Sequence, residues 1–198
     1  MSLKILQIGD DRLTQVSREV EKPQDKKIQR LIAEMCDLCE KDRDGTAGLA
    51  APQVGENIRL TVIRRIDKTD KIRRSDRDRL SREESMKYWD VLINPEIIEK
   101  SEEESVIWEA CLSIGKGDKQ IWGPVSRPDY VRIKYETEQE ESKELEAKGF
   151  FAHLLQHEID HLDGILFTSH VPNVAANLWT AAELDEYIEA NGSYPPVK

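Results

Sequence analysis

The chain has 198 residues, of which 34% are charged and 38% hydrophobic, and its formal net charge is −10. We expect residues 1–198 to form a single domain, because this length suits one domain with a sizeable core. The acidic balance argues against DNA or RNA as the main partner, since phosphate binding needs a basic surface. No apolar run approaches the length of a membrane span, and the first residues lack the pattern of a secretory signal. We therefore expect a cytoplasmic protein with no membrane contact.

The first predicted helix covers Pro23–Lys41, with proline in its first turn and an apolar stripe along one side. Cys36 and Cys39 lie on this stripe and form a CxxC pair, a pattern also typical of redox and zinc sites. Buried cysteine behaves as a small hydrophobe, and the sequence has no second CxxC to complete a zinc site. We interpret both cysteines as core residues.

A run of small residues follows at Thr46–Gly55. Small side chains and glycine let another backbone approach closely, so this run predicts a tight packing loop between a helix and a strand. Gln53 carries the one amide side chain of the run.

Loose alternation and β-branched residues predict strands at Arg59–Ile66, Val91–Ile98 and Val131–Tyr135. Pro95 indicates an edge strand or a bulge. Residues 67–87 are crowded with charges, and we interpret them as a surface insertion with a short helix that begins at the Ser81–Glu84 capping box. Further on, we expect an acidic turn over Glu136–Glu146 and a C-terminal helix over about residues 179–190.

The strongest single motif is an HExxH segment that begins at His157 and ends at His161. Two histidines four residues apart point to the same side of a helix, which lets one metal ion bind both imidazoles. Glu158 can lean over the open coordination position and handle the protons of a metal-bound water. The segment Glu144–Leu162 is predicted to be helical, and Asp163-Gly164 supplies a stop. The alternative is a chance match on an ordinary amphipathic helix.

A metal ion held by two histidines needs at least one more protein ligand. One zinc-protease pattern requires a third histidine six residues after the second, but this chain has Phe167 there, so that pattern fails. A second pattern takes a glutamate from a later helix, for which Glu183 and Glu186 are candidates. A third candidate is Cys111, because a thiolate is a good ligand for Zn²⁺ or Fe²⁺. These last two possibilities stay open on spacing alone.

Three segments, 48–53, 109–113 and 156–162, resemble the signature motifs of the peptide deformylase family, in the order the family has them. The family patterns are GxGxAAxQ, EGCLS and QHExDHL, and this chain reads TAGLAAPQ, EACLS and QHEIDHL. General similarity extends over roughly Lys4–Phe167.

The resemblance implies removal of the formyl group from the N-terminal formylmethionine of newly synthesised polypeptides. It also implies an α+β fold in which antiparallel sheets pack around a central metal-binding HExxH helix, with a strand leading to Cys111. The implied metal ligands are Cys111, His157 and His161. The resemblance favours Fe²⁺ as the physiological ion, while Zn²⁺ or another divalent ion is able to occupy the same donor set.

Roles for other residues follow from the same resemblance. Glu158 is implied as the general base for a metal-bound water that attacks the formyl carbon, and as the donor of that proton to the leaving amine. The Gln53 side-chain amide and the Leu112 backbone N–H are implied to stabilise the oxyanion, where loss of one donor typically costs about 10²–10³ in rate. The substrate backbone is implied to pair with Ala47, Gly48 and Ala110. The methionine side chain would then enter an apolar pocket lined partly by the metal helix.

Several polar residues surround this expected site. We predict that Glu109, Arg127 and Asp160 form one buried charge network behind the ligands, since a carboxylate near the metal helix needs a bidentate partner. His153 lies one turn before His157, and we interpret it as a pocket wall or a satisfied polar residue rather than a ligand. His170 is expected to be exposed.

Two positions depart from the family motifs, because Thr46 and Ala110 stand where glycine is usual. If either position requires a positive φ, a side chain there costs energy and shifts the loop. These two departures suggest an alternative, a relative that binds peptide or metal without turnover. A zinc endopeptidase is a further alternative, which Phe167 and the motifs around Cys111 and Gln53 disfavour. The C-terminal helix also departs from the basic helix that docks bacterial relatives on the ribosome, so contact with the ribosome by that route is not expected. Its acidic residues are Glu183, Asp185, Glu186 and Glu189.

Overall fold

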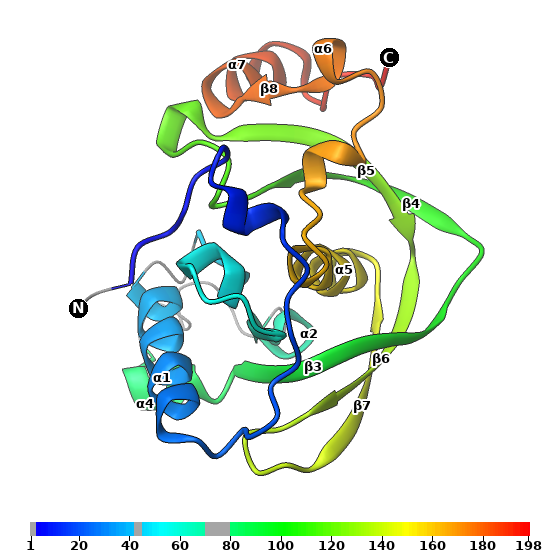
Figure 1. Cartoon of the computed structure of the whole chain (residues 1–198). Coiled ribbons are helices and arrows are strands. Elements are labelled where there is room, and N and C mark those ends of the chain that lie inside the picture. Colours follow the sequence, from blue (N-terminus) through cyan, green and yellow to red (C-terminus); the bar gives the residue numbers. More distant parts are fainter. Residues whose placement is uncertain (1–2, 42–44, 70–79) are drawn as a thin grey trace.

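The computed structural model describes residues 3–41, 45–69 and 80–198. Two antiparallel sheets surround one helix, α5 (Phe150–Leu162), which lies near the middle of the molecule (Figure 1). The predicted α+β class is confirmed. Because α5 contacts strands of both sheets, we propose that the whole chain forms one catalytic domain around it.

The larger sheet has the strand order β1-β2-β3-β6-β7, and the smaller has the order β4-β5-β8. Every pairing is antiparallel. The larger sheet consists of β1 (Gly48–Ala50), β2 (Leu60–Arg64), β3 (Trp89–Lys100), β6 (Tyr130–Glu136) and β7 (Ser142–Lys148). The smaller consists of β4 (Glu104–Ala110), β5 (Ile121–Pro128) and β8 (Trp179–Thr180). In the described part of the chain, β1 and β4 thus each keep one unpaired edge.

Helices α1, α4, α6 and α7 lie toward the outside (Figure 1). Figure 1 shows α1 and α4 together on one side, and α6 and α7 at the top near β8. No helix within the described ranges is long and apolar enough to cross a membrane. The bounds are α1 (Lys26–Lys41), α2 (Ile66–Thr69), α4 (Arg82–Met86), α6 (Val174–Asn177) and α7 (Ala181–Asn191). Short 3-10 turns cover Asp11–Thr14, Ala51–Val54, Gly117–Lys119 and Phe167–Ser169.

The core lies on two sides of the larger sheet. One cluster joins α1 to β1 and β2, and the other joins the apolar side of α5 to β3, β6 and β7. Cys36 and Cys39 are buried, unpaired thiols within the first cluster. The interpretation of this CxxC pair as core is confirmed.

Helix α1 begins three residues later than predicted, at Lys26 instead of Pro23. The Asp25 side chain explains this start, because its Oδ1 accepts a hydrogen bond of 2.8 Å from the Lys27 N–H. Such a cap satisfies a backbone donor at the first turn, so Pro23 lies in the turn before the helix.

The prediction of one helix over Glu144–Leu162 was wrong in its first part. Residues 142–148 form β7, which pairs with β6 in a hairpin, so the turn predicted over Glu136–Glu146 is also too long. Leu145 and Ala147 alternate with charged residues, as in a strand with one covered face, but the charges obscured this short pattern. Gly149 has a φ of 55°, which turns the backbone out of the strand and lets the helix begin at Phe150.

The remaining predictions differ in smaller ways. A register shift between Ile93 and Glu96, which spans Pro95, confirms a bulge in β3, and the Ser81–Glu84 capping box is confirmed at α4. The first two residues of the predicted C-terminal helix form β8, since α7 begins after its cap at Thr180. Strand β5 was not predicted, because Gly123 and two prolines interrupt its sequence pattern. Residues 70–79 of the predicted insertion lie outside the described residues.

Burial raises the pKa of the Cys36 thiol from its ordinary value of 9.0 to about 12. A raised pKa in the folded state stabilises the fold below pH 9, and this contribution is lost as the pH rises from about 9 to about 12. The free energy of unfolding should therefore fall more steeply with pH than it does in Cys36→Ala, by up to about 1.4 kcal/mol per pH unit. Guanidinium titrations between pH 8 and pH 11 measure the free energy of unfolding of both proteins. If the two free energies fell in parallel with pH, the prediction would be wrong.

Candidate metal centre and its surroundings

Three potential metal ligands converge in the centre of the molecule. Cys111 directly follows β4, and α5 presents His157 and His161 one turn apart. All three residues are buried, and their donor atoms lie within 4.8 Å of one another. No other group of three such side chains occurs within residues 3–41, 45–69 and 80–198.

The geometry of this group fits one divalent ion. Cys111 Sγ lies 3.2 Å from His161 Nε2. Bond lengths of about 2.3 Å to sulfur and 2.0–2.1 Å to nitrogen put such donors about 3.6 Å apart in a tetrahedral site, so only a small shift is needed. A thiolate with two imidazoles suits Zn²⁺ or Fe²⁺. Three protein donors also leave a coordination position open, as in catalytic sites.

The electrostatics of the group favour the charged thiolate. Burial by itself raises the pKa of the Cys111 thiol, but the neighbouring His161 and His157 outweigh burial and hold that pKa well below its ordinary value. Burial alone would lower the pKa of His157. Hydrogen bonds to Cys111 and Glu109 outweigh burial, so the pKa of His157 lies well above its ordinary value. The thiolate is the form that binds a metal ion.

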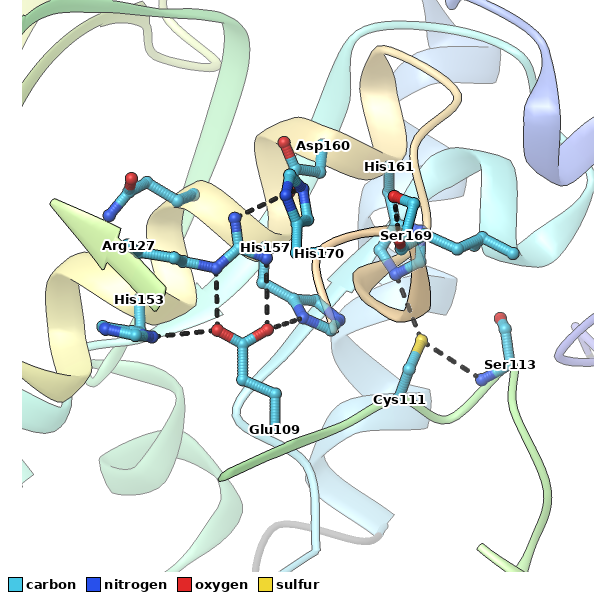
Figure 2. Close-up of polar contacts among 12 residues, drawn as sticks. Glu109, Cys111, Ser113, Arg127, His153, His157, Asp160, His161, Ser169 and His170 are labelled. Atoms are coloured by element: carbon cyan, nitrogen blue, oxygen red, sulfur yellow. Dashed lines mark hydrogen bonds and ion pairs between the residues drawn. The ribbon is translucent and has the colours of Figure 1, made fainter. Parts of the chain in front are cut away.

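The carboxylate of Glu109 organises the space behind the group (Figure 2). Its Oε1 lies 2.7 Å from Arg127 Nε and 2.9 Å from His153 Nδ1. Its Oε2 lies 3.1 Å from Arg127 Nη2 and 2.9 Å from His157 Nδ1. A carboxylate only accepts hydrogen bonds, so Nδ1 of His157 donates its proton to Glu109, and Nε2 is the ring nitrogen that would bind a metal ion after losing its own proton.

The charge network predicted behind the ligands is confirmed. Arg127 Nη1 lies 2.7 Å from Asp160 Oδ2, and the same oxygen lies 3.0 Å from His170 Nε2. The network therefore runs from the surface at His170 to the ring of His157. His170 is exposed, as expected, but its contact with Asp160 was not foreseen.

His153 is a satisfied, buried histidine with 1% of its surface exposed. Its Nδ1 binds Glu109, and its Nε2 lies 3.2 Å from Ser105 Oγ. Its position one turn before His157 was the signal that placed it on this face. No sequence signal pointed to Ser105, which approaches from β4.

Glu158 lies beside the metal group and faces β1. The residue is 3% exposed, and its Oε2 accepts a hydrogen bond of 3.3 Å from Thr61 Oγ1. A Cβ atom at Gly48 would overlap with Oε1, Cδ and Cγ of Glu158, so this position of the chain requires glycine. Burial raises the pKa of Glu158.

The loop after β1 aims the Gln53 amide at the same point. Gln53 Oε1 accepts a hydrogen bond of 2.8 Å from the Ala50 N–H, which orients the side chain. Its Nε2 lies 3.4 Å from Cys111 Sγ and 3.2 Å from Ser113 Oγ. The N-terminal segment holds the Gln53 backbone, since the Leu6 N–H donates to the Gln53 carbonyl at 2.7 Å.

A cleft of about 340 Å³ opens onto this group between β1 and β4. The residues predicted to bind substrate, Ala47, Gly48 and Ala110, all line it, as does Leu112. Neither Thr46 nor Ala110 has a positive φ, so a side chain at these glycine positions does not strain the backbone. Three aromatic residues also line the cleft: Trp108, Trp122 and Phe150.

Two alternatives from the sequence are not supported. Glu183 binds Thr180 at the start of α7, and neither it nor Glu186 belongs to the metal group. Phe167, which replaces the third histidine of a zinc protease, stacks on the His157 ring with centroids 6.0 Å apart.

A thiolate and two imidazoles beside a buried glutamate, on an HExxH helix between two sheets, define a metal-dependent hydrolase. Known proteins give the particular family. A sequence profile described as polypeptide deformylase matches residues 2–177. Peptide deformylase 1 of Bacillus subtilis (strain 168) is 41% identical over 147 residues, which cover 74% of this chain and 76% of that protein.

Solved structures agree. A peptide deformylase from Synechococcus elongatus in complex with actinonin has a TM-score of 0.69 and 30% identity, over 96% of this chain and 86% of that one. A class I type b peptide deformylase from Acinetobacter baumannii with Met-Ala-Ser bound has a TM-score of 0.67 and 30% identity, over 86% of this chain and 100% of that one. The chain belongs to the polypeptide deformylase family, metalloenzymes that remove the N-formyl group from newly synthesised polypeptides.

Replacing Arg127 by alanine should destabilise the protein, because it leaves the Glu109 charge buried without its bidentate partner. We expect a loss of about 3–5 kcal/mol in the free energy of unfolding and a lower metal content after dialysis. Arg132→Ala is the matched control, since its partners Glu99 and Glu144 are exposed and exposed pairs contribute about 1 kcal/mol or less. Urea titration and elemental analysis compare the two variants. Equal stability and metal content in both would refute the role of the network.

Proposed function

We propose that this chain hydrolyses the formyl group from the N-terminal formylmethionine of newly made polypeptides, with Cys111, His157 and His161 as the metal ligands. The observation that carries this proposal is the position of Glu158. Its buried carboxylate lies next to Gly48, at the wall of a cleft that also contains Cys111 and His157. A divalent ion held there would polarise the formyl oxygen and lower the pKa of a water that it binds.

Glu158 acts as the general base and then as the general acid. Burial raises the pKa of its carboxyl group, which brings it closer to the pH at which proton transfer is efficient in both directions. It takes a proton from the attacking water and gives a proton to the amine that leaves. Contact with Thr61 Oγ1, which also binds the Leu49 carbonyl, helps to hold this carboxylate in place.

The oxyanion that forms on the formyl group is stabilised by Gln53 and Leu112. The Gln53 amide is oriented before substrate arrives, because its oxygen is already bound to the Ala50 N–H and its NH₂ group lies beside Cys111 Sγ and Ser113 Oγ at the wall of the cleft. The Leu112 backbone N–H, next to Cys111, supplies the second donor. Donors held in advance cost no reorganisation during the reaction.

The substrate backbone extends the two sheets. In the described part of the chain, β1 and β4 each have a free edge, and the cleft lies between them. A peptide strand laid in the cleft pairs with Ala47 and Gly48 on one side and with Ala110 on the other. The methionine side chain then enters the pocket beside Leu154 and His157 on α5.

Fe²⁺ is the proposed physiological ion, with Zn²⁺ or another divalent ion as an alternative occupant. We place the activity in the cytoplasm, where polypeptides are made. Contact with the ribosome does not involve α7, because its acidic side chains would repel the phosphates of ribosomal RNA. These side chains are Glu183, Asp185, Glu186 and Glu189.

Protein loaded anaerobically with Fe²⁺ should release formate from a formyl-Met-Ala-Ser peptide and nothing from the acetylated peptide. Glu158→Gln should keep the metal and lose about 10²–10⁴ in kcat, the typical contribution of a general acid–base group. Formate assays with protein loaded with Zn²⁺ in parallel test the choice of ion. If protein with one tightly bound metal ion releases no formate, the chain binds peptide or metal without turnover and the proposal is wrong.

Replacing Gly48 by alanine should lower kcat by about 10²-fold, because the added methyl group displaces the Glu158 carboxylate and small errors in position are costly. Metal content should not change, since the three atoms nearest to an added methyl group all belong to Glu158 and not to a proposed ligand. Steady-state kinetics with elemental analysis separate these effects. A variant with unchanged kcat would show that Glu158 is not held by this contact.

A further inference from the structure

We infer that Trp108, braced by Tyr194, forms a binding surface for the second residue of the substrate, and that this surface favours an aromatic side chain there. The inference rests on the proposed function and adds a preference beyond formylmethionine. Trp108 lies on β4 and lines the cleft, while Tyr194 comes from the segment after α7. Their rings are stacked, with centroids 5.5 Å apart and planes inclined by 22°.

Alternation along β4 determines which substrate side chain reaches Trp108. Glu109 points toward α5, where it binds His153 and His157. Trp108 and Ala110 therefore stand on the opposite face of the strand. A peptide that pairs with the edge of β4 also alternates. When its first side chain points toward α5 and the pocket, its second points to the face of Trp108.

The same face carries a second indole. Trp122 on β5 is directly opposite Ala110 in the β4–β5 register, and opposed residues stand on one face of a sheet. Trp122 also lines the cleft. A side chain directed to this face thus meets Trp108 and Trp122 together, and offset or edge contacts between aromatic rings favour Phe over Ala.

Tyr194 is held firmly although half of its surface is exposed, at 51%. The next residue, Pro195, is buried. Lys198 then forms two backbone hydrogen bonds with the side chain of Asn177, of 2.9 and 3.0 Å. Asn177 itself is 1% exposed. The segment is thus held in place by the residues that follow Tyr194. The Tyr194 ring is therefore able to fix the orientation of the Trp108 indole.

The test compares formyl-Met-Phe-Ser with formyl-Met-Ala-Ser on the metal-loaded protein. We expect kcat/KM to be roughly twofold to tenfold higher for the Phe peptide, the range of one aromatic contact. Tyr194→Ala should reduce this ratio toward one, Trp108→Ala should abolish it, and Tyr194→Phe should retain it because the ring remains. Val197→Ala, in the same segment but with an exposed side chain, is the control and should match the unsubstituted protein.

The ratio of two substrates distinguishes a specificity role from a structural one, because a damaged fold lowers both rates together. Affinities of the product peptides Met-Phe-Ser and Met-Ala-Ser, measured by quenching of tryptophan fluorescence, give the same comparison without turnover. Equal rates and affinities for both peptides in the unsubstituted protein would overturn the inference while leaving deformylation intact. A preference that survives Tyr194→Ala would overturn the role of Tyr194. Absence of formate from both peptides would instead refute the proposed function.

Discussion

The site depends on one buried anion, the carboxylate of Glu109. Burying a charge costs several kcal/mol unless hydrogen bonds and an opposite charge compensate it. Here each carboxylate oxygen accepts one hydrogen bond from Arg127 and one from a histidine. These partners come from β5 and α5, while Glu109 itself comes from β4. The two strands and the helix must therefore be in register before the charge is satisfied, and the ring of His157 is oriented by the same arrangement.

The two free strand edges are central to the proposed binding mode, in which one site accepts many polypeptides. An unpaired edge is usually a liability, because it invites pairing with other chains. In this protein β1 and β4 flank the cleft, so backbone hydrogen bonds are available whatever the sequence of the bound peptide. Selectivity is then left to the pocket beside α5 and to side chains on the outer face of β4.

Spacing alone predicted that His157 and His161 lie together on one helix face, because two donors four residues apart share a side of a helix. It left the third ligand open, and the resemblance to the peptide deformylase motifs added Cys111, whose sulfur lies beside the two histidines in the structure. The network around Arg127 could be predicted because a buried carboxylate requires a bidentate partner. Strand β7 was missed because charges obscure a short alternation, and β5 because its prolines and glycine oppose strand formation. Tyr194 carried no signal, since its partner Trp108 is remote in sequence and only the fold brings them together.

The site is made of segments far apart in the chain. Gln53 and Cys111 are 58 residues apart, and Cys111 and His161 are separated by 50 more. Contacts over such separations close large loops, so their formation is slow and comes late in folding. A partly synthesised chain that lacks α5 has neither histidine donor nor Glu158. A copy of this enzyme that is still attached to the ribosome and lacks α5 is therefore unable to process its own N-terminus or that of a neighbour.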